Sequence, residues 1–200
     1  RLGVSVLLFL FLFKLGEAFL GRMAIVFYKE VGFTDTQIAY YSKLMTAGVT
    51  ILFSMAGGLL NARIGIIKGL FVGGIAMAAS NLMFAWIALV GPNERLYAAT
   101  IFVDGFTSAM STVAFVAFIS YFTSHTYTGT QYALLASIGT LGRTLISGAS
   151  GFVVDALHGN WPLFFILTSV MVIPSLILLL YVGRLLKARV VYWEAEKTAA

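Results

Sequence analysis

Long apolar runs recur along this chain, and they constrain its fold more than any other feature. A helix that crosses the roughly 30 Å of bilayer hydrocarbon needs about 20 apolar residues. The chain has 60% hydrophobic and only 10% charged residues, and a soluble domain of this size could not bury so much apolar surface. The pattern predicts an all-α membrane protein with six transmembrane helices, at residues 4–27, 36–60, 67–90, 96–122, 130–156 and 162–186.

The connectors between these runs are short, which leaves no room for a separate catalytic module. We therefore expect one transmembrane bundle over residues 1–190 and a cytoplasmic tail at 191–200. Cysteine is absent, which excludes disulfides and thiolate metal sites, and we predict neither a metal ion nor a cofactor. The chain begins with Arg1 rather than Met, and we interpret it as a fragment of a longer protein.

Positive charges in the connectors predict how the bundle is oriented. Cytoplasmic loops carry an excess of Lys and Arg. Alternating spans place two groups of cations on opposite sides: Arg1, Arg63, Lys68, Arg184, Lys187 and Arg189 on one, and Arg22, Lys29 and Arg95 on the other. We expect the first side, with both termini, to be cytoplasmic. The net charge of +5 is then a signal of topology, and we predict no nucleic-acid partner.

An internal repeat relates the two halves of the chain at an offset of 94 residues. The first copy has Thr34, Thr36, Gln37, Ala39, Thr46, Gly48, Thr50, Gly57, Ala62, Gly65 and Phe71, which recur as Thr128, Thr130, Gln131, Ala133, Thr140, Gly142, Thr144, Gly151, Ala156, Gly159 and Phe165. The T-x-x-Q spacing at each start is that of a capping box that opens a helix. The offset maps the first three spans onto the last three, which run the opposite way. This predicts a 3+3 inverted repeat, as in the six-helix halves of one transporter architecture, although chance matches in a biased composition are the alternative.

Ionisable residues inside the predicted spans are candidate functional residues, since each costs about 2.5 to 3.5 kcal/mol to insert. They are Lys14, Glu17, Lys43, Asp104 and Arg143. Such groups should point into the bundle or into a water-filled path. We predict that the two carboxylates bind protons and that the three cations hold an anionic group of a small-molecule substrate. Lys14 and Glu17 lie three residues apart on one helix face and can pair; a purely structural pair is the competing interpretation, as is a structural role for Arg143.

Aromatic residues in the first span alternate at Phe9, Phe11 and Phe13. Alternation of this kind does not form a single helical stripe. We therefore expect these three side chains to contact lipid.

One short motif suggests an enzyme, and it does not withstand a test of geometry. Gly148-Ala-Ser-Gly151 resembles the serine motif of rhomboid proteases, but a serine nucleophile needs a histidine within hydrogen-bond reach. His158 lies eight residues farther along the same predicted helix, about 12 Å by its rise. We predict that the protein is not an enzyme.

The connector between the second and third spans resembles a loop of the major facilitator superfamily. It reads Gly58-Leu-Leu-Asn-Ala-Arg63-Ile-Gly65-Ile-Ile-Lys68, similar to the G-x-L-x-D-R-x-G-R-K loop found at this point in each half of those transporters. The resemblance implies a conformational role for Gly58, Arg63, Gly65 and Lys68. Ala62 stands in place of the acidic residue, which predicts a weakened gating salt bridge.

A narrower resemblance covers nearly the whole chain. The segments Phe13–Glu17, Phe27–Gln37, Ala114–Phe118, Thr130–Leu135, Leu141–Arg143 and Trp161–Phe165 resemble the C-terminal half of AmpG-type muropeptide permeases. The resemblance implies a symporter in the bacterial inner membrane that uses the proton gradient to import anhydromuropeptides for peptidoglycan recycling, and through it β-lactamase induction. It places Lys14, Glu17 and Arg143 at charged family positions.

The partners follow from this resemblance. A six-helix half requires the lipid bilayer and either a missing N-terminal six-helix half or a second copy of itself. Two alternatives remain: a transporter of acetyl-CoA or another anionic solute from the same superfamily, and a non-transporting membrane scaffold or six-helix homodimer.

Overall fold

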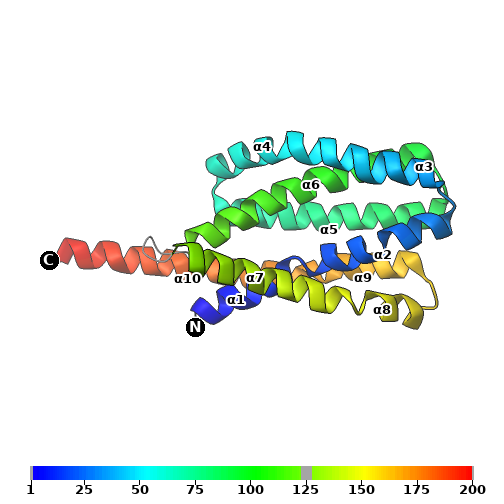
Figure 1. The fold of residues 1–200 in the computed structure, drawn as a ribbon. Helices are drawn as coiled ribbons and strands as arrows, with labels where there is room; N and C mark the ends of the chain where they lie inside the picture. Colours follow the sequence, from blue (N-terminus) through cyan, green and yellow to red (C-terminus); the bar gives the residue numbers. More distant parts are fainter. Residues whose placement is uncertain (1, 123–127, 200) are drawn as a thin grey trace.

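Helices make up nearly all of the described chain (Figure 1). The computed structural model describes the backbone of residues 2–122 and 128–199, and their side chains except at 128, 142 and 189–199. In chain order the elements are α1 (Leu2–Phe13), α2 (Leu15–Val31), α3 (Asp35–Gln37), the π-helical segment η1 (Ile38–Met45), α4 (Thr46–Ile64), α5 (Ile66–Val90), α6 (Glu94–Tyr121), α7 (Thr128–Ser147), α8 (Ser150–Ala156), α9 (Trp161–Val170) and α10 (Val172–Ala199). The described residues contain no strand, which confirms the predicted fold class.

Five helical stretches of the described chain are long and apolar enough to cross a membrane: Leu2–Val31, Asp35–Ile64, Ile66–Val90, Glu94–Tyr121 and Trp161–Ala188. They coincide with five of the six predicted spans. The other predicted span, 130–156, is helical as α7 and α8 but is not among the five. It is interrupted at Gly148 and Ala149, and α7 carries many hydroxyl residues, so it is less apolar than the rest.

The helices pack in pairs that follow the 94-residue offset. α4 of the first triplet packs along α6 of the second, and α7 of the second triplet packs along α1 and α2 of the first. These are equivalent pairs, because the offset exchanges the first span with the fourth and the second with the fifth. The third span, α5, packs against α9 and α10 of the sixth, its own counterpart. The bundle therefore has the packing expected of an inverted repeat.

The helix ends show one feature of the repeat in both copies and another in the first copy. The Thr34 hydroxyl accepts from the Gln37 backbone N–H at 3.3 Å, and the Gln37 side chain accepts from the Thr34 N–H at 3.0 Å, so the first capping box is formed. The second box begins at Thr128, whose side chain lies outside the described residues. Gly65 and Gly159, 94 residues apart, both have positive φ, at 87° and 72°, where glycine is favoured.

Two clusters of buried apolar side chains form the core. One gathers residues from α2, the end of α5, the start of α6 and α9, including Phe27, Phe84 and Phe165. The other gathers residues from α1, the end of α6 and α10, including Phe9 and Phe13. The expectation that Phe9 and Phe13 contact lipid was wrong, because both are fully buried. Residues four apart share a helix face, and this face packs against α6.

Both termini lie at the same end of the bundle as the turn between α4 and α5 (Figure 1). Arg63, Lys68, Arg184 and Lys187 are at or near this end, and Lys29 and Arg95 are at the other. These six cations are therefore grouped as predicted from alternating spans. Arg1 and the side chain of Arg189 lie outside the described residues, and Arg22 lies within α2. α10 continues without a break to Ala199, beyond the predicted end of the last span.

Candidate functional site

The first span is broken at Lys14, halfway along its length. α1 ends at Phe13 and α2 begins at Leu15, with Lys14 between them at φ −94° and ψ 6°. This is the sparsely populated bridge region, in which many active-site residues are found. Discontinuous helices build the substrate and ion sites of many transporters. The break therefore places a charged side chain at a backbone feature typical of such sites.

The Lys14 ammonium group is buried and fully engaged. Its side chain is only 9% exposed and its Nζ lies 2.5 Å from Glu17 Oε2. Nζ also donates to Thr112 Oγ1 at 2.8 Å and to Ser111 Oγ at 3.4 Å, both on α6. An ammonium group has three donors and no acceptor, so these three oxygens satisfy it. The predicted pairing of Lys14 with Glu17 is confirmed.

The Glu17 carboxylate links the pair to its surroundings. Its side chain is 20% exposed, and its second oxygen, Oε1, accepts from the Ser108 hydroxyl at 2.9 Å. The positive charge of Arg143, on α7, also acts on this carboxylate. Arg143 is exposed on the surface of the bundle, so Glu17 lies between a buried cation and an exposed one.

Asp104 lies one helical turn from Ser108 on the same helix. Asp104 Oδ1 accepts from the Ser80 hydroxyl, on α5, at 3.0 Å, and Ser80 is within 3.5 Å of the Thr107 hydroxyl. The charges of Glu17 and Lys14 act on Asp104 as well. The structure thus brings three of the five predicted residues together inside the bundle with a set of hydroxyl residues. We call this group the polar layer: Lys14, Glu17, Ser80, Asp104, Thr107, Ser108, Ser111 and Thr112.

The polar layer lies between the two apolar clusters. On α6, residues 104–112 separate Ile101 of one cluster from Ala114 of the other, and on α5 Ser80 lies between Leu70 and Phe84. In the first span, Lys14 and Glu17 lie between Phe13 and Phe19. The charged groups are therefore held at mid-depth, where a low dielectric strengthens their interactions.

The hydroxyl residues of α6 were not predicted as part of the site. With Asp104 they recur at i, i+3, i+4, i+7 and i+8, the spacing of one helix face, at Thr107, Ser108, Ser111 and Thr112. This polar stripe inside an apolar span is visible in the sequence. It could have identified α6 as the partner of Lys14 and Glu17.

Two glycines let the helices approach closely enough to form the layer. A Cβ on Gly16, between Lys14 and Glu17, would lie 2.6 Å from the carbonyl oxygen of Thr168 on α9. A Cβ on Gly73 would lie 3.2 Å from Cα of Ser111. Small residues at such crossings are typical of helix packing in membranes.

Lys43 lies apart from the polar layer. It is exposed on η1, and within the described residues neither recorded ion pair involves it. With Arg143, it differs from the buried groups in facing outward from the six-helix bundle. Both would need a water-filled path or a further protein surface to avoid lipid. π-helical segments such as η1 often occur at functional sites.

The loop residues lie where the family motif predicts. Gly58 is half-buried in α4, Arg63 is exposed at the end of that helix, Gly65 forms the turn, and Lys68 is exposed in the first turn of α5. Neither cation takes part in the ion pairs of the described chain. This agrees with the missing acidic residue at Ala62, although the roles of these residues stay predictions.

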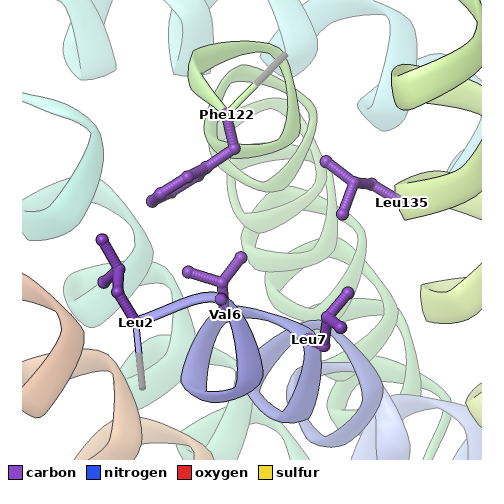
Figure 2. A pocket seen from close by; sticks show the side chains of 6 residues that line it. Leu2, Val6, Leu7, Phe122 and Leu135 are labelled. Carbon is purple, nitrogen blue, oxygen red and sulfur yellow. The ribbon is translucent and has the colours of Figure 1, made fainter. Parts of the chain in front are cut away.

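A pocket of about 360 Å³ opens at the end of the bundle near the N-terminus, away from the polar layer. Figure 2 shows five of the residues that line it, from α1, the end of α6 and α7. The lining residues are apolar, and one of them is a glycine: Leu2, Gly3, Val6, Leu7, Phe122 and Leu135. The described residues that line the pocket offer no charged group.

Comparison with known proteins places this fold. The chain is 34% identical over 182 residues to "Putative transporter AmpG 4" of Rickettsia felis, which covers 91% of this chain and 44% of that protein. It is 30% identical over 176 residues to "Anhydromuropeptide permease" of Escherichia coli K12, covering 88% of this chain and 35% of that protein. The chain therefore spans less than half the length of the curated relatives it matches.

The family assignment rests on a match over nearly the whole chain. The family model of the Major Facilitator Superfamily matches residues 6–197. The resemblance drawn from the sequence, to AmpG-type members of that superfamily, is confirmed by these relatives. The spans, the mirrored packing and the family match agree that this is a multi-pass membrane protein. The chain belongs to the Major Facilitator Superfamily.

Proposed function

We propose that this chain is the C-terminal half of a proton-coupled transporter that imports anhydromuropeptides for peptidoglycan recycling, and thereby supports β-lactamase induction. Two independent observations support the proposal. One is the similarity to proteins named AmpG and anhydromuropeptide permease. The other is the Lys14–Glu17 pair, held at a helix break at mid-depth in a bundle of transporter type.

The observation that carries the coupling proposal is the asymmetric burial of this pair. Lys14 is 9% exposed and bonded to α6, whereas Glu17 is 20% exposed and lies within the field of Arg143. When Glu17 is ionised, its single negative charge is shared between Lys14 and Arg143. When it accepts a proton, Arg143 loses its compensating charge and becomes available to an anionic group of the substrate. Protonation and substrate binding are thus coupled through one carboxylate.

The whole transporter requires a second six-helix half. We propose that it packs on the face that carries Arg143 and Lys43, since both are exposed on this bundle and would there line a path between the halves. Alternating access would come from one half rocking against the other. We further propose that the protein lies in the inner membrane, with the termini of this half cytoplasmic, because the unpaired loop cations gather at that end.

Uptake by membrane vesicles that contain the complete protein tests this function. We expect labelled anhydromuropeptide to accumulate when the outside is acidic, and an uncoupler to abolish accumulation. Labelled acetyl-CoA, offered in the same way, should not accumulate. Accumulation of acetyl-CoA instead would assign the alternative substrate class.

The variant Glu17→Gln tests the coupling residue. It should abolish pH-driven uptake while leaving the amount of protein in the membrane unchanged. Asp155→Asn is the matched control, because Asp155 is an exposed carboxylate at the end of α8, far from the polar layer, and it should transport normally. Uptake by Glu17→Gln that still collapses with an uncoupler would remove Glu17 from the mechanism.

A further inference from the structure

Three exposed cations gather where α5 begins and α10 passes it. Lys68 lies in the first turn of α5, and Arg184 and Lys187 lie on α10. The two helices are in close contact here, because a Cβ on Gly183 would lie 3.1 Å from Ile67 Cγ2. Ile67 and Gly183 are the neighbours of Lys68 and Arg184 in the chain. The contact therefore places Lys68 near Arg184, and Lys187 follows Arg184 at i+3 on the same face of α10.

These cations have no carboxylate partner in the described part of the chain. The ion pairs recorded there are Lys14–Glu17 and Lys29–Asp35, and both lie elsewhere. The first turn of α5 adds the positive end of a helix dipole, which favours anions. The site thus combines three cations that have no carboxylate partner among the described residues with the positive end of the α5 dipole.

Apolar rows lead away from these cations into the depth of the membrane. On α5, Val72 and Ile75 follow Lys68 at i+4 and i+7, and they are 47% and 48% exposed. On α10, Ile177 and Tyr181 precede Arg184 at i−7 and i−3, and they are 64% and 46% exposed. Residues at these spacings share a helix face. On each helix, the cation therefore lies on the same face as a row of exposed apolar side chains.

Both rows face outward from the same side of the bundle. The opposite face of α5 packs against α6, and that of α10 packs against α1. Gly74 and Leu176 close the seam between the two helices, since a Cβ on Gly74 would lie 2.6 Å from Leu176 Cδ2. The surface is therefore a shallow apolar strip with a cationic end, and the molecule that it complements has an acyl chain and an anionic headgroup.

We propose that this surface binds an anionic phospholipid, with the phosphate held by Lys68, Arg184 and Lys187 and the acyl chains lying along α5 and α10. Basic sites between transmembrane helices on the cytoplasmic side are suited to such headgroups. A soluble anion would use only the cations. The exposed apolar rows at the correct depth favour a lipid. The site is separate from the polar layer, since it lies at the end of the bundle on its outer side.

Lipid titration of the complete protein in neutral detergent tests the proposal. Phosphatidylglycerol should bind more tightly than phosphatidylcholine with the same acyl chains, as followed by native mass spectrometry. Each cation near the surface is expected to contribute about fivefold in affinity, so Arg184→Gln with Lys187→Gln should weaken phosphatidylglycerol binding by about 25-fold. Binding of phosphatidylcholine should not change.

Arg95→Gln is the matched control, because Arg95 is an exposed arginine at the opposite end of the bundle. It should leave the preference for phosphatidylglycerol intact. Equal loss in this control, or a double variant that keeps the preference, would overturn the proposal. So would competition by inorganic phosphate, which would indicate a site for soluble anions.

The unaltered protein offers a test that does not depend on how the variants fold. Because the headgroup contact is electrostatic and lies at the membrane surface, phosphatidylglycerol binding should weaken as salt rises. Binding that is insensitive to salt would contradict a cationic site.

Discussion

Replacing Lys14 with methionine removes the cation that Glu17 pairs with and leaves a carboxylate at mid-depth in the bundle. The variant loses the ion pair at 2.5 Å and the hydrogen bonds to Thr112 and Ser111 at 2.8 and 3.4 Å. Removing one partner of a buried pair costs about 3 to 5 kcal/mol. We expect the lower end, about 3 kcal/mol, because Glu17 is 20% exposed and keeps Ser108 as a donor.

The double variant Lys14→Met with Glu17→Gln separates the loss of charge balance from the loss of packing. It has no carboxylate at position 17 that needs a compensating cation, and the amide oxygen of Gln at that position can still accept from Ser108. Replacing both members of a buried pair with neutral groups is often close to neutral, so we expect its stability to lie within about 1 kcal/mol of the parent.

Reversible unfolding of the complete protein in mixed micelles, driven by increasing sodium dodecyl sulfate, measures these free energies. The reasoning is refuted if Lys14→Met costs no more than a surface substitution such as Arg95→Gln. It is also refuted if the double variant is less stable than Lys14→Met, since the pair would then not be the source of the cost.

Two further predictions concern the contacts around the layer. Gly16→Ala should destabilise the bundle by about 1 to 3 kcal/mol through overpacking, because its Cβ would meet the Thr168 carbonyl at 2.6 Å. Gly21→Ala is the control, because a Cβ there would lie in open space on the same helix. It should be neutral or slightly stabilising in the same unfolding assay. Ser80→Ala should cost about 1 to 3 kcal/mol, the range for a buried acceptor that loses its donor, because it removes the hydroxyl that donates to Asp104. Ser80→Thr keeps a hydroxyl at this position and should restore most of the loss. No loss in Ser80→Ala would show that the bond is not formed.

Much of the fold was predictable because apolar runs, and the capping residues and glycines at their ends, are local signals. The third predicted span, 67–90, matches Ile66–Val90 almost residue for residue, and the T-x-x-Q spacing correctly located the start of the second span at Thr34. Gly65 and Gly159 lie at equivalent positions of the two triplets, 94 residues apart. Each has a positive φ, a backbone conformation that favours glycine.

Features of the site that depend on tertiary contacts could not be predicted from local sequence signals. Lysine is a good helix former, so nothing local predicts the break at Lys14; the hydroxyls of α6 are its tertiary partners. The prediction for Phe9 and Phe13 was wrong because it rested on the alternating pattern of aromatic residues. The two residues are also four apart, a spacing that puts them on one helix face, and that face is buried. The pairing of Lys14 with Glu17 was predictable, since residues three apart on a helix are neighbours.

The exposed positions of Lys43 and Arg143 were also beyond sequence reasoning. Charges inside an apolar span predict sequestration from lipid, but not which surface provides it. On this bundle both side chains face outward, whereas Lys14 is buried. Three of the five predicted charged residues, Lys14, Glu17 and Asp104, therefore lie inside the bundle, and the other two lie on its surface.

Accessibility of the polar layer to water tests the central claim most directly. The chain has no cysteine, so a single introduced cysteine reports its own position once any cysteines elsewhere in the complete protein are replaced. Thr112 is exposed and bonded to Lys14, and Leu82, on α5, is 49% exposed on the outer side. In transporting vesicles, a membrane-impermeant maleimide should label Thr112→Cys, and anhydromuropeptide should slow the labelling, while Leu82→Cys stays unlabelled. Equal labelling of both positions, or labelling of Thr112→Cys that substrate does not slow, would contradict a transport path through the polar layer.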